Sequence, residues 1–289
     1  MINLIVKFEK NNTILSDFVD FDLKQTFTCG QCFRWDALPD GSYCGIAFGK
    51  VLKISAEGTR FVLHGVSKKD YTDFWEQYFD IRRDYSAIKK SLDISDTMNK
   101  AISAGKGIRI LRQDIWETTL SFIISASNNI PRIRKIIAAL CEQFGDKLDD
   151  GFYSFPTPER LKGITADDLA PIKAGFRAKY IADAVNKVTS GEIDLYGLEK
   201  LDTDSARKEL LKINGIGNKV ADCILLFSLG RMEVFPVDVW INNTMCALYP
   251  DRCTSIANVR TAGPEIFGEN CGIAQQYLFY YARENGGNI

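Results

Sequence analysis

Residues 210–240 decide the fold and read LLKINGIGNKVADCILLFSLGRMEVFPVDVW. The Asn-Gly-Ile-Gly segment at 214–217 separates two apolar runs, and its glycines permit positive φ and close backbone approach. The segment therefore predicts a tight turn between two helices, the second beginning near Asn218. The first N–H groups of that helix have no intrahelical partner. Beside Gly215 and Gly217 they suit a phosphate of nucleic acid.

Lys219 and Asp238 are the candidate catalytic residues of this stretch. A lysine attacks only as a neutral amine, and the locally positive start of a helix disfavours its ammonium form. Asp238 follows Phe-Pro-Val and precedes the apolar run 239–248, which predicts a helix N-cap. A capping carboxylate stays ionised and can receive a proton or stabilise a cation. Taken singly, the two residues also fit a solvated surface lysine and a purely structural cap.

The stretch resembles the helix-hairpin-helix Gly/Pro/Asp (HhH-GPD) motif of base-excision DNA glycosylases, and most closely that of the 8-oxoguanine DNA glycosylase/AP lyases. The matches are Gly215, Gly217, Lys219, Val220-Ala221-Asp222-Cys223 and Pro236-Val237-Asp238-Val239. Asn214 stands where the family usually has proline, and Trp240 where it has histidine. The resemblance implies that Lys219 attacks C1′ of the damaged nucleoside and that Asp238 assists.

Further blocks resemble the same family in the same order. Residues 28–35, TCGQCFRW, resemble its N-terminal "GQ.FRW" strand. Residues 111–114 and 127–133 resemble its central helix and the DNA-facing loop after it, and 175–180 a second DNA-facing turn. Residues 273–279 resemble the C-terminal helix that lines the base pocket.

The resemblance implies a base pocket with five contributors. The carbonyl of Gly30 would accept N7–H of oxidised guanine and repel the N7 lone pair of guanine, a difference of about 1–3 kcal/mol. Gln275 would bond the Watson–Crick edge, Phe279 would stack on the purine, and Phe227 and Cys223 would also touch it. By spacing alone, Phe279 and Phe227 fit equally well as core aromatics.

The resemblance also implies contacts around the extruded nucleotide. Candidates for filling its gap or contacting the opposite base are Ser127, Asn128, Asn129, Arg132, Phe176 and Arg177. Relatives read the opposite cytosine with an asparagine, two arginines and a tyrosine. Here Ser127 and Phe176 replace the asparagine and the tyrosine. These replacements predict a relaxed opposite-base preference.

The spacing of the cysteines bears on metal binding. Cys29 and Cys32 form a C-x-x-C, but zinc sites usually show a second tight ligand pair, which the sequence lacks. The spacing of Cys246 and Cys253 resembles the start of an iron–sulfur loop without its two closely following cysteines, which predicts no cluster. No organic cofactor and no essential metal are expected. The resemblance implies only a structural K⁺ or Na⁺ at the carbonyls of Leu211, Ile213 and Ile216.

The hydrophobic pattern predicts an α+β fold with two domains. Residues 1–105 form an N-terminal antiparallel sheet domain with flanking helices, including hairpins at 32–48 and 51–64. Residues 106–289 form a helical HhH-GPD catalytic domain of two helical subdomains with the active-site cleft between them. Helices are predicted to start after Asp114 and near Thr157, Thr165 and Ala178.

The amino-acid composition disfavours some classes of function. The net charge of −1 argues against a broad nucleic-acid-coating protein, and one histidine disfavours histidine-based acid–base catalysis. Eight cysteines without a secretory signal predict a reducing, intracellular location, in the cytoplasm or nucleoid and not in a membrane.

These observations predict a monomeric, bifunctional DNA glycosylase/AP lyase. It would excise 8-oxoguanine from duplex DNA by base flipping, a Schiff base at Lys219 and β-elimination. Its partner would be double-stranded DNA that contains 8-oxoguanine or an abasic site. Two alternatives stay open. One is a monofunctional glycosylase for another lesion, and the other is a non-catalytic helix-hairpin-helix DNA-binding protein.

Overall fold

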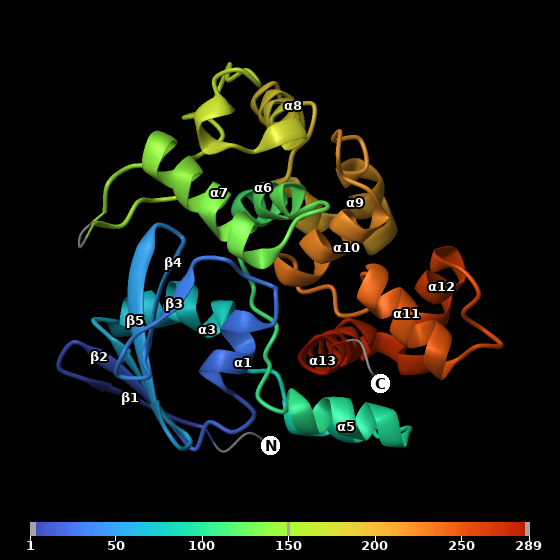
Figure 1. Cartoon of the computed structure of the whole chain (residues 1–289). Helices are drawn as coiled ribbons and strands as arrows, with labels where there is room; N and C mark the ends of the chain where they lie inside the picture. The colour runs from blue at the N-terminus through green and yellow to red at the C-terminus, as the bar shows by residue number, and fades with distance from the viewer. Residues whose placement is uncertain (1–3, 149–150, 287–289) are drawn as a thin grey trace. The chain divides into compact units, whose positions relative to one another are not determined.

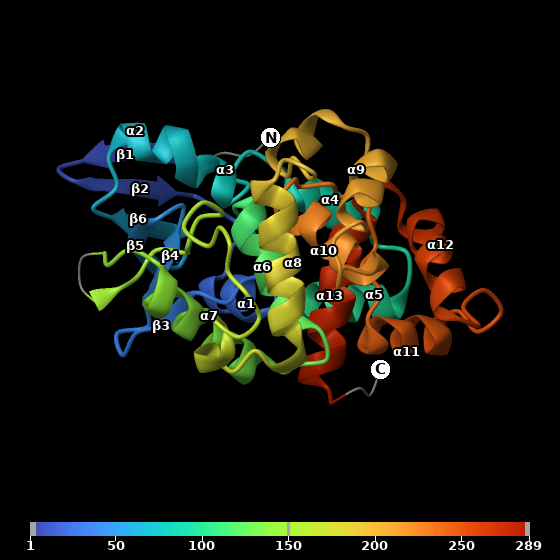
Figure 2. The same ribbon diagram turned by 90° about the horizontal axis from the view of Figure 1, so that it is seen from above.

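Six strands form one sheet in the order β1-β2-β6-β5-β4-β3 (Figures 1 and 2; β6 is labelled in Figure 2). The computed structural model describes residues 4–148 and 151–286, so the parts of the predicted domains at 1–3, 149–150 and 287–289 lie outside it. The strands are β1 (Ile5–Glu9), β2 (Asn12–Ser16), β3 (Trp35–Ala37), β4 (Tyr43–Ala47), β5 (Lys50–Glu57) and β6 (Arg60–His64). Both predicted hairpins are confirmed.

The β-hairpins form because their turns and their apolar alternation agree. Asp40 bonds the backbone N–H of Ser42 at 3.0 Å, which closes the turn between β3 and β4. In β5, Leu52 and Ile54 are fully buried and lie two residues apart, as one face of a strand requires. Neighbouring strands run antiparallel, with Gly45 opposite Leu52.

Helices make up most of the remainder, which confirms the α+β class. The α-helices before residue 112 are α1 (Leu23–Thr28), α2 (Lys68–Asp70), α3 (Glu76–Tyr78), α4 (Tyr85–Ser91) and α5 (Asp96–Ala104). Those after it are α6 (Ile115–Ser125), α7 (Ile130–Phe144), α8 (Ala178–Thr189), α9 (Thr203–Leu210), α10 (Asn218–Phe227), α11 (Val239–Leu248), α12 (Ile256–Phe267) and α13 (Cys271–Glu284). A π-helical turn spans Tyr71–Trp75, and 3₁₀ turns span Ala170–Ile172, Gly175–Arg177, Tyr196–Lys200 and Gly268–Asn270.

The chain folds into two compact units that interleave along the sequence. Unit 1 comprises Met1–Gln31, Ser55–Leu111 and Gly230–Ile289, and unit 2 comprises Cys32–Ile54 and Arg112–Leu229. The predicted domain boundary near residue 105 stays a prediction. Within unit 1, α13 packs beside α5 (Figure 1). Within unit 2, α6 contacts both α8 and α10 and is buried along nearly its whole length (Figure 2).

Two local predictions were wrong. Residues near Thr157 and Thr165 begin turns rather than helices, because Thr157 and Thr165 close short hydrogen-bonded turns with Arg160 and Asp168 instead of a periodic helix. Residues 28–34 do not form a strand: α1 ends at Thr28, and a loop runs to Trp35, where β3 begins. The predicted N-cap at Asp114 is confirmed, since its carboxylate accepts the N–H of Glu117 at 2.9 Å.

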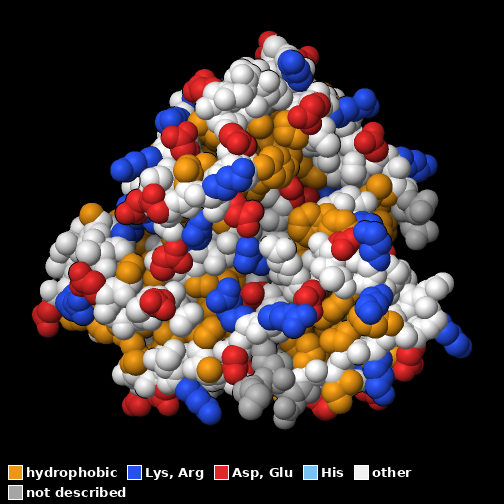
Figure 3. All heavy atoms as spheres, turned by 180° about the vertical axis from the view of Figure 1, so that it is seen from behind, with side chains coloured by type: hydrophobic (Ala, Val, Ile, Leu, Met, Phe, Trp, Pro, Cys, Tyr) orange, Lys and Arg blue, Asp and Glu red, His pale blue; other side chains and the backbone are white. Residues whose placement is uncertain are grey.

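The surface carries both signs of charge. On the face drawn in Figure 3, acidic and basic side chains are interspersed, in keeping with a net charge of −1. Among the described residues no helix is long and apolar enough to cross a membrane.

Candidate active site

Lys219 occupies the first turn of α10, which starts at Asn218 as predicted. The N-cap is Gly217, which has no side-chain oxygen with which to bond the first N–H groups of the helix. Those groups can therefore bond an oxygen of a ligand such as phosphate. Lys219 itself is half-buried, so the hairpin holds its amine close to the protein surface.

A clamp from α8 fixes the hairpin turn. Asp183 accepts two hydrogen bonds from Asn214, at 2.8 Å from the backbone N–H and at 2.8 Å from the side-chain amide. Lys187 lies 3.2 Å from the same carboxylate and also donates to the carbonyl of Lys212. Proline at position 214 would have neither donor, so the departure from the family pattern gives this chain its own anchor.

The turn also depends on glycine. Gly215 has φ of +85°, and a Cβ there would lie 2.5 Å from the ring of Tyr180, which stands one turn before Asp183 on α8. Any side chain at 215 would clash with that ring. Tyr180, Asp183 and Lys187 lie on one face of α8, and together they hold the turn.

We expect Asp183→Ala to lower the free energy of unfolding by about 2 kcal/mol, because both donors of Asn214 lose their acceptor. Urea unfolding measures the change. Asp167→Ala, which alters an exposed aspartate of the same unit, is the matched control and should change stability by less than about 0.5 kcal/mol. Equal midpoints for Asp183→Ala and wild type would show that the clamp contributes nothing.

A buried ion pair ties the two hairpin helices together. Asp222 of α10 is 1% exposed and accepts a hydrogen bond from Arg207 of α9 at 2.6 Å. Burial lowers the pKa of Arg207, whereas Asp222 and then Asp204 raise it, and the net direction is upward. The ion pair fixes α9 against α10.

Aromatic rings lie under the candidate nucleophile. The Nζ of Lys219 lies 5.2 Å from the ring centre of Phe122 on α6, within the range of a cation–π contact. Phe122 in turn stacks on Phe227, with ring centres 5.5 Å apart. Phe227 is 2% exposed and Cys223 is 4% exposed, so in unit 2 both are packed residues of α10.

Asp238 belongs to unit 1 and caps α11 as predicted. Its carboxylate accepts the N–H of Ile241 at 2.8 Å. The residues that follow are unusually exposed for their type, Val239 at 70% and Trp240 at 41%. Trp240 therefore presents an aromatic surface at the start of α11.

The side chain of Gln31 holds the loop that contains Gly30 in place. The side chain of Gln31 is fully buried, donates to the carbonyls of Thr26 and Arg109 at 2.9 and 2.8 Å, and accepts the N–H of Leu111 at 2.9 Å. Gly30 has φ of +88°, a conformation that favours glycine. Gln31 thus explains why a glutamine follows the glycine in this motif.

Unit 1 brings Gly30 and Phe279 together. A Cβ on Gly30 would lie 3.3 Å from the half-buried ring of Phe279 on α13. Gln275, one turn earlier, is 4% exposed, and its side-chain oxygen accepts from Gln276 at 2.8 Å. Burial raises the pKa of the adjacent Cys29 thiol to about 11, which keeps it protonated near neutral pH. Three of the predicted pocket residues therefore belong to one unit.

Arg177 joins the two predicted DNA-facing loops. It is 2% exposed, and its guanidinium donates to the carbonyl of Ala126 at 2.8 Å, to that of Ser127 at 2.8 Å and to that of Ala174 at 3.3 Å. Ser127 has φ of +48°, which is costly for a residue other than glycine. Most donors of Arg177 are thus engaged by backbone, and its predicted role at the opposite base stays a prediction.

The other candidate residues of the two loops differ in exposure and in the hydrogen bonds that their side chains make. Phe176 is 52% exposed, and its own neighbour Arg177 lies 4.3 Å from its ring centre. Asn129 caps α7 by accepting the N–H of Arg132 at 3.0 Å, and Asn128 donates to the carbonyl of Ile124 at 3.0 Å. Phe176 is thus exposed, and its insertion into a gap in a duplex stays a prediction.

The monovalent-cation site at the hairpin carbonyls stays a prediction. The carbonyl of Ile213 accepts the N–H of Ile216 at 3.1 Å and keeps a second lone pair. Carbonyl oxygens suit hard cations, so Leu211, Ile213 and Ile216 could hold a monovalent ion through backbone alone. Among the described residues, no group of three histidine, cysteine or acidic side chains could hold a metal ion.

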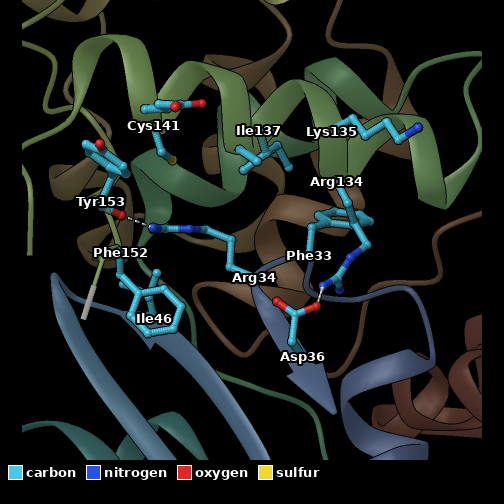
Figure 4. A pocket seen from close by; sticks show the side chains of 13 residues that line it. Phe33, Arg34, Asp36, Ile46, Arg134, Lys135, Ile137, Cys141, Phe152 and Tyr153 are labelled. Atoms are coloured by element: carbon cyan, nitrogen blue, oxygen red, sulfur yellow. Dashed lines mark hydrogen bonds and ion pairs between the residues drawn. The ribbon is translucent and has the colours of Figure 1, made fainter. Parts of the chain in front are cut away.

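A cavity of about 510 Å³ lies in unit 2 between β4 and α7 (Figure 4). Arg34 crosses it, donates to the carbonyl of Tyr153 and lies 3.3 Å from Glu117 of α6. Burial raises the pKa of Glu117, and Arg34 partly offsets that rise. The predicted catalytic residues do not line this cavity, and Arg34 connects the residue before β3 to α6.

Sequence reasoning missed Asp183, Arg207 and Gln31 as structural supports of the site. A faint signal existed for Asp222, because a carboxylate inside the apolar helix 218–227 needs a buried partner. Nothing local marked Asp183, since its partner lies 31 residues away.

Comparison with known proteins places the whole chain in one family. The model of the 8-oxoguanine DNA glycosylase N-terminal domain matches residues 13–119, and that of the HhH-GPD superfamily base excision DNA repair proteins matches residues 120–258. The probable N-glycosylase/DNA lyase of Methanothermobacter thermautotrophicus is 29% identical over 92% of this chain and 95% of its own length.

Two solved structures share the fold throughout. Clostridium acetobutylicum 8-oxoguanine glycosylase/lyase, in complex with double-stranded DNA that has cytosine opposite 8-oxoG, is 43% identical, with a TM-score of 0.95 over 99% of this chain and 100% of that one. MBOgg1 in complex with a low-affinity DNA ligand is 44% identical, with a TM-score of 0.95 over 98% and 99%. This chain therefore belongs to the 8-oxoguanine DNA glycosylase family of the HhH-GPD superfamily and is a DNA N-glycosylase with lyase activity.

Proposed function

We propose that this enzyme excises 8-oxoguanine from duplex DNA through an imine at Lys219. The observation that carries the proposal is the position of Lys219, in the first turn of α10 with its Nζ 5.2 Å from the ring centre of Phe122. The similarity to a glycosylase/lyase whose structure contains 8-oxoG in duplex DNA supports the substrate. The damaged nucleotide is flipped out of the helix before reaction.

The proposed reaction begins with a displacement at C1′ of the damaged nucleoside. The neutral amine of Lys219 forms a bond to C1′, and the glycosidic C1′–N9 bond breaks, so that the base leaves with the electron pair and takes up a proton. Opening of the sugar ring gives the protonated imine. Loss of a proton from C2′ then expels the 3′ phosphate, and the strand is cut by β-elimination. Asp238 supports deprotonation of Lys219 and the developing positive charge on the sugar.

The ring of Phe122 suits the positive charge that develops on the nitrogen of Lys219. An aromatic face attracts a cation, and the nitrogen of Lys219 becomes cationic in the protonated imine. The face can therefore stabilise that intermediate. The half-buried position of Lys219 limits its exposure to water.

Borohydride trapping tests the proposal. We expect a covalent protein–DNA band with a duplex that contains one 8-oxoguanine or one abasic site, and none with an undamaged duplex. Base release without a band would support the monofunctional alternative. Binding without release or a band would support a non-catalytic module, for which the duplex is only a ligand.

We expect the base opposite the lesion to affect the rate of excision less than in relatives that contact cytosine with an asparagine and a tyrosine. Ser127 is exposed with φ of +48°, and Phe176 carries no hydroxyl, so two polar contacts are replaced. Each good base contact is worth about 1–3 kcal/mol of discrimination. We expect single-turnover excision opposite adenine to be within about tenfold of that opposite cytosine. A ratio near 1,000 would contradict this prediction.

A further inference from the structure

Arg283 lies beside two residues predicted to bind the extruded base. It stands one turn after Phe279 on α13, and its guanidinium carbon lies 5.7 Å from the ring centre of Phe279 and 5.5 Å from that of Tyr280. A Cβ on Gly30 would lie 3.8 Å from Nη1 of Arg283 and 3.3 Å from the Phe279 ring. Backbone, ring and guanidinium thus meet at one place within unit 1.

One end of this guanidinium is held out of water without an acceptor. Among the described residues, Nη1 of Arg283 is buried and has no hydrogen-bond partner, whereas Nη2 lies 3.3 Å from Glu284. The side chain as a whole is 22% exposed, so it is not sealed in the core. A buried donor without a partner is unfavourable, and packing against two rings keeps it there. Its position suits an acceptor that arrives with a ligand.

The lesion offers such an acceptor at the matching place. On the Hoogsteen edge of 8-oxoguanine, the N7–H donor stands between two oxygens, O6 and O8. If the carbonyl of Gly30 takes N7–H, a donor beside Gly30 lies next to one of these oxygens. Guanidinium groups are well suited to carbonyl oxygens of guanine. The pair Gly30 and Arg283 would then complement the edge as one acceptor and one donor.

We propose that Arg283 is a specificity-determining residue of the base pocket, which donates from Nη1 to an oxygen on the Hoogsteen edge of the extruded 8-oxoguanine. The inference rests on the proposed function and deepens it. It also explains a long cationic side chain in an otherwise apolar turn of α13, where Leu278, Tyr280 and Ala282 are buried.

Two substitutions test the inference. Arg283→Leu keeps apolar packing against Phe279 and removes every donor, and Arg283→Lys keeps the charge but not the planar donor. We expect single-turnover excision of 8-oxoguanine to fall about 10- to 100-fold in Arg283→Leu, with a smaller loss in Arg283→Lys. Strand cleavage at a preformed abasic site needs no base contact and should fall no more than about twofold. Arg252→Leu, which alters an exposed arginine paired with Glu265, is the matched control.

The two oxygens can be separated by affinity. In a Lys219→Gln background, binding is compared for duplexes with 8-oxoguanine and with 8-oxoadenine, which keeps O8 and N7–H but has an amino group in place of O6. A bond to O8 predicts that Arg283→Leu weakens binding to both duplexes. A bond to O6 predicts a loss with 8-oxoguanine alone.

The outcomes that overturn the inference differ from those that overturn the function. Wild-type rates of excision in Arg283→Leu, or equal losses of excision and abasic-site cleavage, would remove Arg283 from base recognition. Failure of the wild type to release 8-oxoguanine would overturn the proposed function, and this inference with it.

Discussion

Lys219→Gln is expected to lower excision of 8-oxoguanine by on the order of 10⁴-fold, equivalent to about 5 kcal/mol of barrier, and to abolish the borohydride-trapped band. Glutamine keeps the length of the side chain but has no basic lone pair with which to attack C1′. Because Lys219 lies at the surface end of α10 rather than in its packed part, the fold should survive the change. Single-turnover kinetics and trapping, measured on the same duplex, check both effects.

Lys212→Gln is the matched control for this experiment. Lys212 belongs to the same hairpin and is paired with Glu209 at 2.7 Å, but it is exposed. Its loss should leave the trapped band in place. A band of wild-type intensity from Lys219→Gln would mean that another amine forms the imine, and it would remove the central claim of the mechanism.

Arg177→Leu is expected to lower the free energy of unfolding by about 3 kcal/mol, the largest stability effect of the substitutions considered. The carbonyls of Ala126, Ser127 and Ala174 would each lose a charged donor. The strained φ of Ser127 would also lose the bond that holds it. Urea unfolding gives the change in stability.

Arg160→Leu provides the comparison, because Arg160 is an exposed arginine of unit 2 with one bond to a carbonyl, at 3.3 Å. Its replacement should change stability by less than about 0.5 kcal/mol. If Arg177→Leu is as stable as Arg160→Leu but alters the cytosine-to-adenine ratio, Arg177 acts on the opposite base and not on the loops.

Local features of the fold were predictable from sequence because their causes are local. The N-caps Asp114 and Asp238 bond N–H groups three residues ahead, and the start of α10 follows from the glycines before it. The hairpin between β3 and β4 depends on a turn whose residues are contiguous. In these places the residue types and their spacing contain the whole physical reason for the structure.

The supports of the site could not be predicted, because their reasons lie far away in the chain. Arg109 is 1% exposed and donates to the carbonyls of Phe79 and Arg83, at 3.1 and 2.9 Å, although its neighbours read as an ordinary apolar run. Arg177 likewise donates to the carbonyls of Ala126 and Ser127, which lie about 50 residues earlier in the chain. The sequence alone does not distinguish a buried arginine from an exposed one. That difference is visible only in the folded structure.

The interleaving of the two units has a consequence for biosynthesis. Every residue of unit 2 precedes Gly230, so the ribosome finishes that unit while the last segment of unit 1 is still unmade. The face of α5 with the buried residues Met98 and Ala101 receives α13, which ends at Glu284. That face must therefore stay uncovered until α13 has been made. A nascent chain stalled before α13 would expose it, and exposed apolar surface of this kind promotes aggregation.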